Sequence, residues 1–189
     1  MGGHGKLCRR FDEVNHAHAL TFSCFQRRPL LSKDRSRQWM IDAIELARSR
    51  HKLHLWAYVI MPEHVHLVFW PTTPDYSVSS ILTTLKQSAA KRALRYVKRQ
   101  APDFLALMED RRVDGAIVHR FWQRGGGYDR NLIEPVTVLN QIDYLDRNPL
   151  RRGLCERMTD WLWSSAAERE HPGTGLLRLD RASVPSVTK

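Results

Sequence analysis

Two histidines separated by one residue open an apolar segment that follows Pro62. If residues 64–70 form a β-strand, the alternation of side chains sends His64 and His66 to the same face, about 7 Å apart. Two neutral imidazoles in this arrangement can bind one divalent metal ion. Because buried imidazoles need hydrogen bonds to offset their desolvation, the same spacing is also compatible with two core histidines that bind no metal.

A tyrosine and an asparagine four residues apart, Tyr144 and Asn148, lie in a segment with helical periodicity. Side chains at this spacing share one face of a helix. A tyrosine can act as a nucleophile when a cation stabilises its phenolate or activates its target. The amide oxygen of Asn148 could then complete a metal site with His64 and His66. Taken alone, Tyr144 would be a packing aromatic and Asn148 a residue of the helix C-terminus.

A second tyrosine, Tyr128, is a rival nucleophile. It follows three consecutive glycines at residues 125–127, and loops of this kind often carry function. By contrast, Tyr58 lies inside an apolar segment and Tyr96 lies beside the apolar stripe of a helical segment, so we expect both to pack in the core.

Hydrophobic periodicity predicts one α+β domain that positions these residues. Apolar or alternating segments predict strands, and segments with apolar residues three and four apart predict helices. The order strand, helix, strand, strand, helix, strand describes a ferredoxin-like split βαβ antiparallel sheet with helices on one face. An added C-terminal helix carries Tyr144. The expected strands span residues 17–25, 53–61, 64–70 and 116–123, and the expected helices span residues 36–50, 78–99 and 134–147.

The ends of the chain differ in composition from its centre. We expect residues 1–15 to be a flexible N-terminal arm, residues 16–167 to form the domain, and residues 168–189 to be a weakly ordered basic tail. No apolar run reaches the roughly 18 residues that cross a bilayer, and the first residues lack the apolar core of a secretory signal. We therefore expect a cytoplasmic protein with no membrane partner.

The sequence carries a large excess of positive charge. Its 30 Lys and Arg residues against 20 Asp and Glu residues give a formal net charge of +10, spread along the chain. Attraction between such cations and phosphates dominates the affinity of proteins for nucleic acids. The charge therefore favours a nucleic-acid partner, although a merely basic soluble protein would have the same composition.

Six blocks of residues, in a fixed order between roughly residues 16 and 165, carry a family resemblance. They are Phe25-Gln-Arg-Arg-Pro29, Val59-Ile-Met-Pro-Glu-His-Val-His-Leu-Val68, Leu85-Lys-Gln87, Phe121-Trp-Gln-Arg124, Asp143-Tyr-Leu-Asp-Arg-Asn-Pro-Leu-Arg-Arg-Gly153 and Asp160-Trp-Leu-Trp-Ser-Ser165. Together they resemble the REP-associated tyrosine transposases, which are single-tyrosine members of the His-hydrophobic-His nucleases.

The resemblance implies a fold, a cofactor and a reaction. It implies the ferredoxin-like sheet, an Mg²⁺ or Mn²⁺ ion bound by His64 and His66 with Asn148 as a further ligand, and attack by Tyr144 on a DNA phosphate. The implied function is metal-dependent, transposase-like cleavage and rejoining of single-stranded or hairpin repeat DNA through a 5′-phosphotyrosine intermediate. Imidazole ligands suit Mn²⁺ better than the harder Mg²⁺, but both ions stay open. The implied setting is the bacterial cytoplasm near the nucleoid, as a monomer or a homodimer.

Four basic residues are candidates for holding DNA phosphates: Arg27, Arg28, Lys86 and Arg124. Lys86 is the foremost of these, because it lies near the edge of its helix's apolar stripe whereas later lysines and arginines face outward. Two features depart from the family pattern. The glycines at residues 125–127 loosen the loop after Arg124, and Asp146 and Arg147 add charge beside Tyr144.

Two other functions stay open from the residues alone. The first alternative is a domesticated protein that binds DNA hairpins without cleaving them, for which a basic surface would suffice. The second is a metal-dependent hydrolase of small phosphoesters, which the charge and the helix tyrosine disfavour. The presence of both histidines, the tyrosine and the asparagine favours the DNA-cleaving enzyme.

Overall fold

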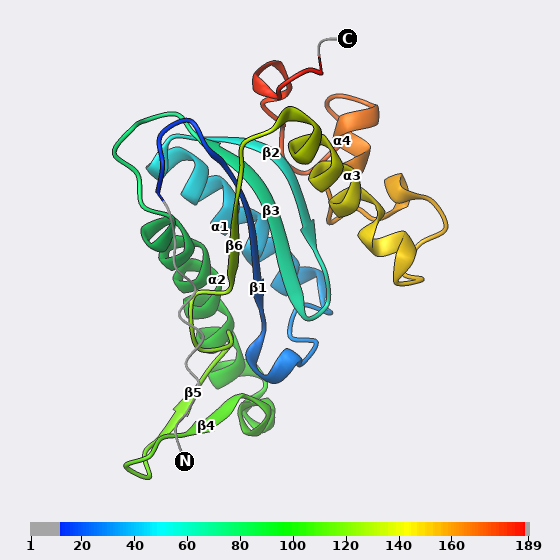
Figure 1. Ribbon diagram of the computed structural model, residues 1–189. Coiled ribbons are helices and arrows are strands. Elements are labelled where there is room, and N and C mark those ends of the chain that lie inside the picture. The colour runs from blue at the N-terminus through cyan, green and yellow to red at the C-terminus, as the bar shows by residue number, and fades with distance from the viewer. Residues whose placement is uncertain (1–11, 188–189) are drawn as a thin grey trace.

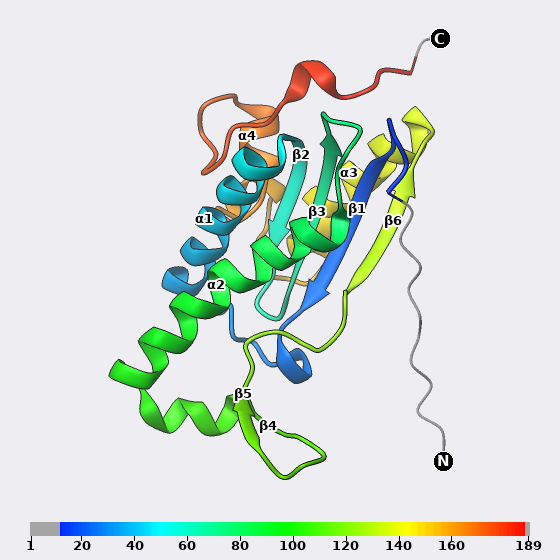
Figure 2. The same cartoon turned by 90° about the vertical axis from the view of Figure 1, so that its left-hand side faces the viewer.

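A four-stranded antiparallel sheet forms the centre of the computed structural model, which describes residues 12–187 (Figure 1). The strands are β1 (Ala17–Ser23), β2 (Leu53–Ile60), β3 (His64–Pro71) and β6 (Tyr128–Leu132), in the order β2-β3-β1-β6. The helices α1 (Asp34–His51) and α2 (Val78–Gln100) lie on one face of the sheet, and α3 (Pro135–Arg151) lies on the other (Figure 2). The predicted α+β class is therefore confirmed.

The smaller elements connect this core. They are the 3₁₀ turns η1 (Phe25–Arg27), η2 (Pro102–Met108), η3 (Met158–Asp160) and η4 (Arg181–Ser183), the short helix α4 (Ala166–Glu170), and a separate hairpin of β4 (Glu109–Arg111) and β5 (Ile117–His119). None of the helices in the described part of the chain combines the length and the apolar character needed to cross a lipid bilayer.

Alternation along the strands divides the buried side chains into two cores. Leu20 and Phe22 of β1 point toward α1 and α2, whereas Ala17 and Ala19 point toward α3. The helix α3 contributes Val138, Ile142 and Leu145 to this second core. Because successive side chains of a strand point to opposite faces, this division also decides which polar residues of β1 and β3 face α3.

The fourth strand of the sheet differs from the prediction. Within the predicted strand 116–123, residues Ile117–His119 form β5, which pairs only with β4 in a hairpin that projects from the domain (Figure 2). On the side of β1 away from β3, the strand that completes the sheet is β6, with Ala17 opposite Leu132. Its sequence Tyr-Asp-Arg-Asn-Leu is polar because β6 is an edge strand with little to bury, so hydrophobic periodicity could not reveal it.

The glycines at residues 125–127 do more than loosen a loop. Gly127 has a φ of +70°, and a Cβ at this position would lie 2.3 Å from the carbonyl oxygen of Thr21. Such a distance is a steric clash, so only glycine lets the start of β6 approach β1 this closely. The departure from the family pattern therefore includes one glycine that the packing requires.

The C-terminal segment packs against the domain, contrary to the weak order predicted for residues 168–189. Leu177 is buried, and the carboxylate of Asp180 accepts hydrogen bonds from Arg48 of α1 and from the backbone N–H of Leu55 in β2, each at 2.8 Å. The indole of Trp56 donates to Ser183 at 2.8 Å. At the other end, most of the predicted arm, residues 1–11, lies outside the described residues.

Candidate active site

The two histidines of β3 lie side by side on the face of the sheet that α3 covers. His66 is opposite Thr21 of β1 and Val59 of β2, and Val59 belongs to the core under α3. The ring centroids of His64 and His66 are 4.6 Å apart, with the ring planes nearly perpendicular at 87°. The strand spacing therefore brings both imidazoles to one place, as the sequence predicted.

Thr21 and Asn148 flank the ring of His66. The Thr21 Oγ1 atom lies 2.6 Å from Nδ1 of His66, and the Asn148 amide lies 3.5 Å from its Nε2. Burial, together with the smaller effect of the neighbouring charge of His64, lowers the pKa of His66 to about 3. His66 is therefore neutral at physiological pH, and a neutral imidazole has a lone pair for a metal ion.

Glu63 and Arg152 form a charged pair beside His64. The Nδ1 atom of His64 lies 3.2 Å from Glu63 Oε1, which also accepts a hydrogen bond from Arg152 at 2.8 Å. Burial lowers the pKa of His64, and the carboxylate of Glu63 partly opposes this. Burial alone would raise the pKa of Glu63, but the hydrogen bond from Arg152 and the charges of His64 and Arg152 outweigh it and leave that pKa below its usual value.

The helix α3 presents a polar stripe to the histidines. Tyr144, Asn148 and Arg152 follow one another at intervals of four residues and so share one face. The Tyr144 ring centroid is 6.0 Å from that of His66, and the side chain remains 41% exposed. The guanidinium of Arg151 lies 5.6 Å from the centre of the Tyr144 ring. Tyr144 is thus held beside the histidines while part of the residue stays accessible to a substrate.

Asp146 anchors α3 from the side of the helix that faces the core. Its carboxylate accepts hydrogen bonds from the Ser165 hydroxyl at 2.9 Å and from Nε of Arg169 at 2.7 Å. Arg169 also donates to the backbone carbonyl of Trp56 in β2 at 2.8 Å, which ties α3 to the sheet. The negative charge of Asp146, which departs from the family pattern in the sequence, therefore serves to pack α3 against the rest of the domain.

One cavity of about 250 Å³ unites these groups. Its lining comprises residues of β1, η1, β3 and α3, of the turn before β3, and the residue that follows α3: Thr21, Ser23, Arg27, Glu63, His64, His66, Tyr144, Asn148 and Arg152. The sequence singled out five of them, namely Arg27, His64, His66, Tyr144 and Asn148. Arg152 continues the four-residue spacing of Tyr144 and Asn148, so that spacing could have found it, whereas Thr21 and Ser23 reach the cavity only through the pairing of β1 with β3.

The other three DNA-contact candidates are engaged elsewhere. The guanidinium of Arg28 donates to the carbonyl of Leu107, and Arg124 forms an ion pair with Asp110 at 2.8 Å. The ammonium of Lys86 donates to the carbonyl oxygens of residues 123 and 125, at 2.9 and 3.0 Å. Lys86 therefore holds the glycine loop in place, and of the four candidates only Arg27 lines the cavity.

The rival nucleophile Tyr128 does not line the cavity. It begins β6, is 60% exposed, and is opposite Thr21, so one strand separates it from His66. Tyr144 is the tyrosine that contacts the histidine pair.

The donor set fits a divalent metal ion. One ring nitrogen of each histidine faces an oxygen of a neighbouring side chain, Thr21 or Glu63, and this is how metal-binding histidines are usually oriented. The other nitrogen of each ring and the Asn148 amide, turned with its oxygen toward His66, would be the ligands. Within residues 12–187 no group of three or more His, Cys, Asp or Glu side chains could hold a metal, so any third protein ligand beside the two histidines would come from another residue type, such as this amide.

Comparisons with known proteins find similarity to transposases. Residues 14–105 match the model of the family described as "Transposase IS200 like". A curated protein of Haemophilus influenzae, named a REP-associated tyrosine transposase, is 25% identical over 143 residues, which cover 72% of this chain and 76% of that protein.

A solved structure shares the fold. It is that of a REP-associated tyrosine transposase bound to a REP hairpin, with a TM-score of 0.67, 19% identity, and coverage of 100% of this chain and 94% of that one. Residues 14–105 are therefore similar to the IS200-like transposases, the resemblance of the chain to the REP-associated tyrosine transposases is confirmed, and the solved structure shows the same fold.

Proposed function

We propose that this chain cleaves and rejoins DNA strands, with Tyr144 as the nucleophile. The observation that carries the proposal is the single cavity in which His64 and His66 of β3 meet Tyr144 and Asn148 of α3. The two histidines are separated from Tyr144 and Asn148 by about 80 positions in the sequence, and a purely structural role would not require that the two pairs line one accessible cavity together.

The reaction is a transesterification at a DNA phosphate. Tyr144 gives its phenol proton to solvent, and its oxygen forms a bond to phosphorus while the bond from phosphorus to the 3′-oxygen breaks. The 3′-oxygen takes up a proton and becomes a free hydroxyl, and the 5′ side of the break stays attached to Tyr144. Attack by the same or another 3′-hydroxyl reverses the step, so that rejoining needs no external energy.

The remaining residues of the cavity bind and orient. His64, His66 and Asn148 would hold Mg²⁺ or Mn²⁺, and the bound ion would supply Lewis-acid polarisation of the scissile phosphate. Thr21 and Glu63 keep the two imidazoles in place through their outer ring nitrogens. The guanidinium of Arg27, which lines the cavity, binds a phosphate of the DNA.

The substrate is single-stranded or hairpin DNA. The net charge of +10 supports an anionic polymer as partner. The solved structure that shares this fold has a REP hairpin bound, which supports a DNA hairpin here. A hairpin-binding protein that does not cleave has the same charge and fold, so the reaction itself must be measured.

The test is the detection of a covalent protein–DNA adduct. Labelled hairpin and single-stranded oligonucleotides, including repeats from the source genome, are incubated with the protein and Mn²⁺ or Mg²⁺ and separated on a denaturing gel. We expect an adduct with the wild type and the Tyr128→Phe control, and none with Tyr144→Phe or His64→Ala. An adduct that persists in Tyr144→Phe but disappears in Tyr128→Phe would move the nucleophile to β6.

A second measurement separates the enzyme from a binding protein. Mn²⁺ should raise the thermal unfolding temperature of the wild type and of Tyr144→Phe, because ligand binding stabilises only the folded state. The same ion should not stabilise His64→Ala. Tight hairpin binding without an adduct, and without stabilisation by Mn²⁺, would favour the non-cleaving hairpin-binding protein.

A further inference from the structure

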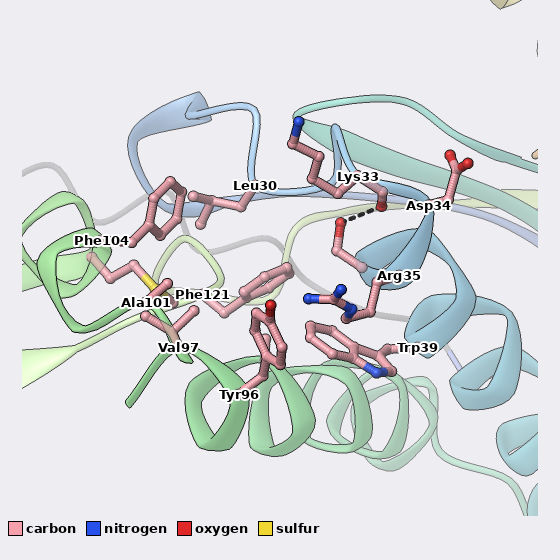
Figure 3. A pocket seen from close by; sticks show the side chains of 13 residues that line it. Leu30, Lys33, Asp34, Arg35, Trp39, Tyr96, Val97, Ala101, Phe104 and Phe121 are labelled. Atoms are coloured by element: carbon pink, nitrogen blue, oxygen red, sulfur yellow. Dashed lines mark hydrogen bonds between the residues drawn. The ribbon is translucent and has the colours of Figure 1, made fainter. Parts of the chain in front are cut away.

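A second and larger cavity, of about 580 Å³, lies between the N-terminal end of α1, the C-terminal half of α2 and η2 (Figure 3). It shares no lining residue with the candidate active site. Its volume lies within the range of roughly 300–1,000 Å³ that is typical of small-molecule sites. We call it the aromatic pocket, because four aromatic side chains line it: Trp39, Tyr96, Phe104 and Phe121.

The aromatic side chains provide flat surfaces from three elements and one loop. Trp39 of α1 and Tyr96 of α2 have ring centroids 5.8 Å apart, and the hydroxyl of Tyr96 points into the pocket (Figure 3). Phe104 of η2 is 39% exposed, and Phe121, after β5, is buried. Such surfaces suit a planar ring, because stacking is most favourable between parallel or tilted flat groups.

Positively charged side chains lie beside the aromatic rings of the pocket. The guanidinium of Arg35 lies over the ring of Tyr96 at 4.1 Å from its centroid, and Lys33 also lines the pocket (Figure 3). The carboxylate of Asp34, also in the lining, forms an ion pair with Arg37 at 3.0 Å. The charge that faces an occupant of the pocket is therefore mainly positive.

A shallow basic depression continues from the pocket along α2. It has a volume of about 270 Å³ and is lined by Arg92, Arg95, Tyr96, Arg99 and Gln100. Tyr96 lines both cavities, which makes them neighbours. Arg92 pairs with Asp42, while no acidic residue lines the depression. Arginines in such a groove suit phosphate groups.

One short segment of the chain contributes residues to both the aromatic pocket and the candidate active site. Arg27 lines the catalytic cavity, and Leu30, three residues later, lines the aromatic pocket. The backbone N–H of Phe25 donates to the carbonyl of Phe121 at 2.9 Å, which joins the η1 segment to the pocket wall. The segment from η1 to Leu30 therefore connects the catalytic cavity, on the α3 face of the sheet, with the aromatic pocket, on the face that α1 and α2 cover (Figure 2).

We propose that the aromatic pocket receives an unpaired nucleobase of the bound DNA strand, with the adjoining phosphates on Arg95 and Arg99. Aromatic side chains combined with a positively charged groove are the features that bind single-stranded nucleic acids. The inference rests on the proposed DNA-processing function and deepens it, because it assigns the recognition of unpaired DNA to a surface outside the catalytic cavity.

Photocrosslinking provides a direct test. 5-Iodo-2′-deoxyuridine is placed at each position in turn of the unpaired flanks of a DNA hairpin, the complex with the full-length protein is irradiated, and crosslinked peptides are identified by mass spectrometry. We expect one flank position to crosslink to Trp39, Tyr96 or Phe104. Binding and cleavage of the same DNA without any crosslink at these residues would overturn this proposal alone.

Affinity measurements supply the matched control. Phe104→Ala should weaken binding of the flanked hairpin by between about 5-fold and about 150-fold, as expected for the loss of one base–aromatic stack. It should leave the affinity for a hairpin without flanks unchanged. Leu107→Ala changes an exposed side chain of the same 3₁₀ turn that does not line the pocket, so it should leave both affinities unchanged. Equal weakening by both variants would overturn the proposal.

The remaining outcomes distinguish the alternatives. Crosslinks in the pocket without formation of the Tyr144 adduct would sustain this inference and refute the cleavage reaction. No binding of the flanked hairpin by the wild type would refute both. Thermal stabilisation by free deoxynucleoside monophosphates without any crosslink to DNA would make the pocket a site for free nucleotides. A dimer that Phe104→Ala dissociates would make it a protein interface instead.

Discussion

The orientation of His66 depends on one hydroxyl group of the neighbouring strand. Thr21 reaches Nδ1 of His66 at 2.6 Å because the two residues are directly opposite in the β1–β3 pairing. If Nδ1–H donates to this hydroxyl, Nε2 keeps its lone pair and points toward Asn148, 3.5 Å away. In this tautomer the hydroxyl fixes the ring with Nε2 directed toward Asn148, which is the arrangement that a metal ion bound at Nε2 would require.

Thr21→Val should therefore weaken metal binding without changing the shape of the strand. The variant removes the hydrogen-bond acceptor, and the affinity for Mn²⁺ should fall by about 10-fold to 100-fold. Isothermal titration of Mn²⁺ measures this directly, with Thr21→Ser as the variant that keeps the hydroxyl. Equal affinities of the wild type and Thr21→Val would show that the sheet alone orients His66.

At the scale of elements, α3 uses its acidic residues in two different ways. Asp146 faces the core and accepts hydrogen bonds from Ser165 and Arg169, whereas Asp143 faces solvent and pairs with Arg147 one turn later at 2.7 Å. The side chain of Asp146 is 8% exposed and that of Asp143 is 57% exposed. Only the first of these carboxylates fixes the helix that carries Tyr144.

Asp146→Ala should lower the free energy of unfolding by about 2–4 kcal/mol, because it leaves the partly buried cation of Arg169 without its partner. Asp143→Ala, three residues away on the same helix, should change it by less than about 0.5 kcal/mol, as is usual for exposed pairs. Urea denaturation of both variants provides the measurement. Similar losses in the two variants would contradict an anchoring role specific to Asp146.

The sequence predicted those parts of the fold and the site that follow from local spacing. The helices α1 and α2 and the strands β1, β2 and β3 have strong apolar periodicity, and the pairs His64/His66 and Tyr144/Asn148 follow from the geometry of one strand and one helix. The edge strand β6 and the contact of Thr21 with His66 depend on which strands pair, and no local pattern encodes that. Helical periodicity places Lys86 near the apolar stripe of its helix. Its hydrogen bonds to the loop after β5 depend on the tertiary arrangement, which periodicity does not encode.

At the scale of the whole molecule, the C-terminal segment closes one end of the domain. Its glycines, prolines and polar residues predicted weak order, but a few contacts are enough to hold it. Leu177 enters the first core, and Asp180 bridges α1 and β2 through Arg48 and the N–H of Leu55. The composition of a segment is an average over its residues, so it does not predict contacts that single residues such as Leu177 and Asp180 make.

Deletion of residues 176–189 should destabilise the protein by about 2–4 kcal/mol. The loss combines the burial of one leucine, worth roughly 1.5–3 kcal/mol, with hydrogen bonds worth about 0.5–1.5 kcal/mol each, less the entropy regained by the freed chain. Chemical denaturation measures the change, and deletion of residues 188–189 alone serves as the control. Unchanged stability of the longer deletion would show that the segment adds nothing to the domain.

The β4–β5 hairpin has a consequence for engineering the molecule. It pairs only with itself, and Val113 at its tip is fully exposed, so nothing in the sheet depends on the residues of the turn. A short epitope inserted between Asp114 and Gly115 should shift the melting temperature by no more than about 2 °C in calorimetry. A larger shift would show that the tip supports the domain. If the shift is small, this turn offers an internal attachment point for reporters that leaves both ends of the chain untouched.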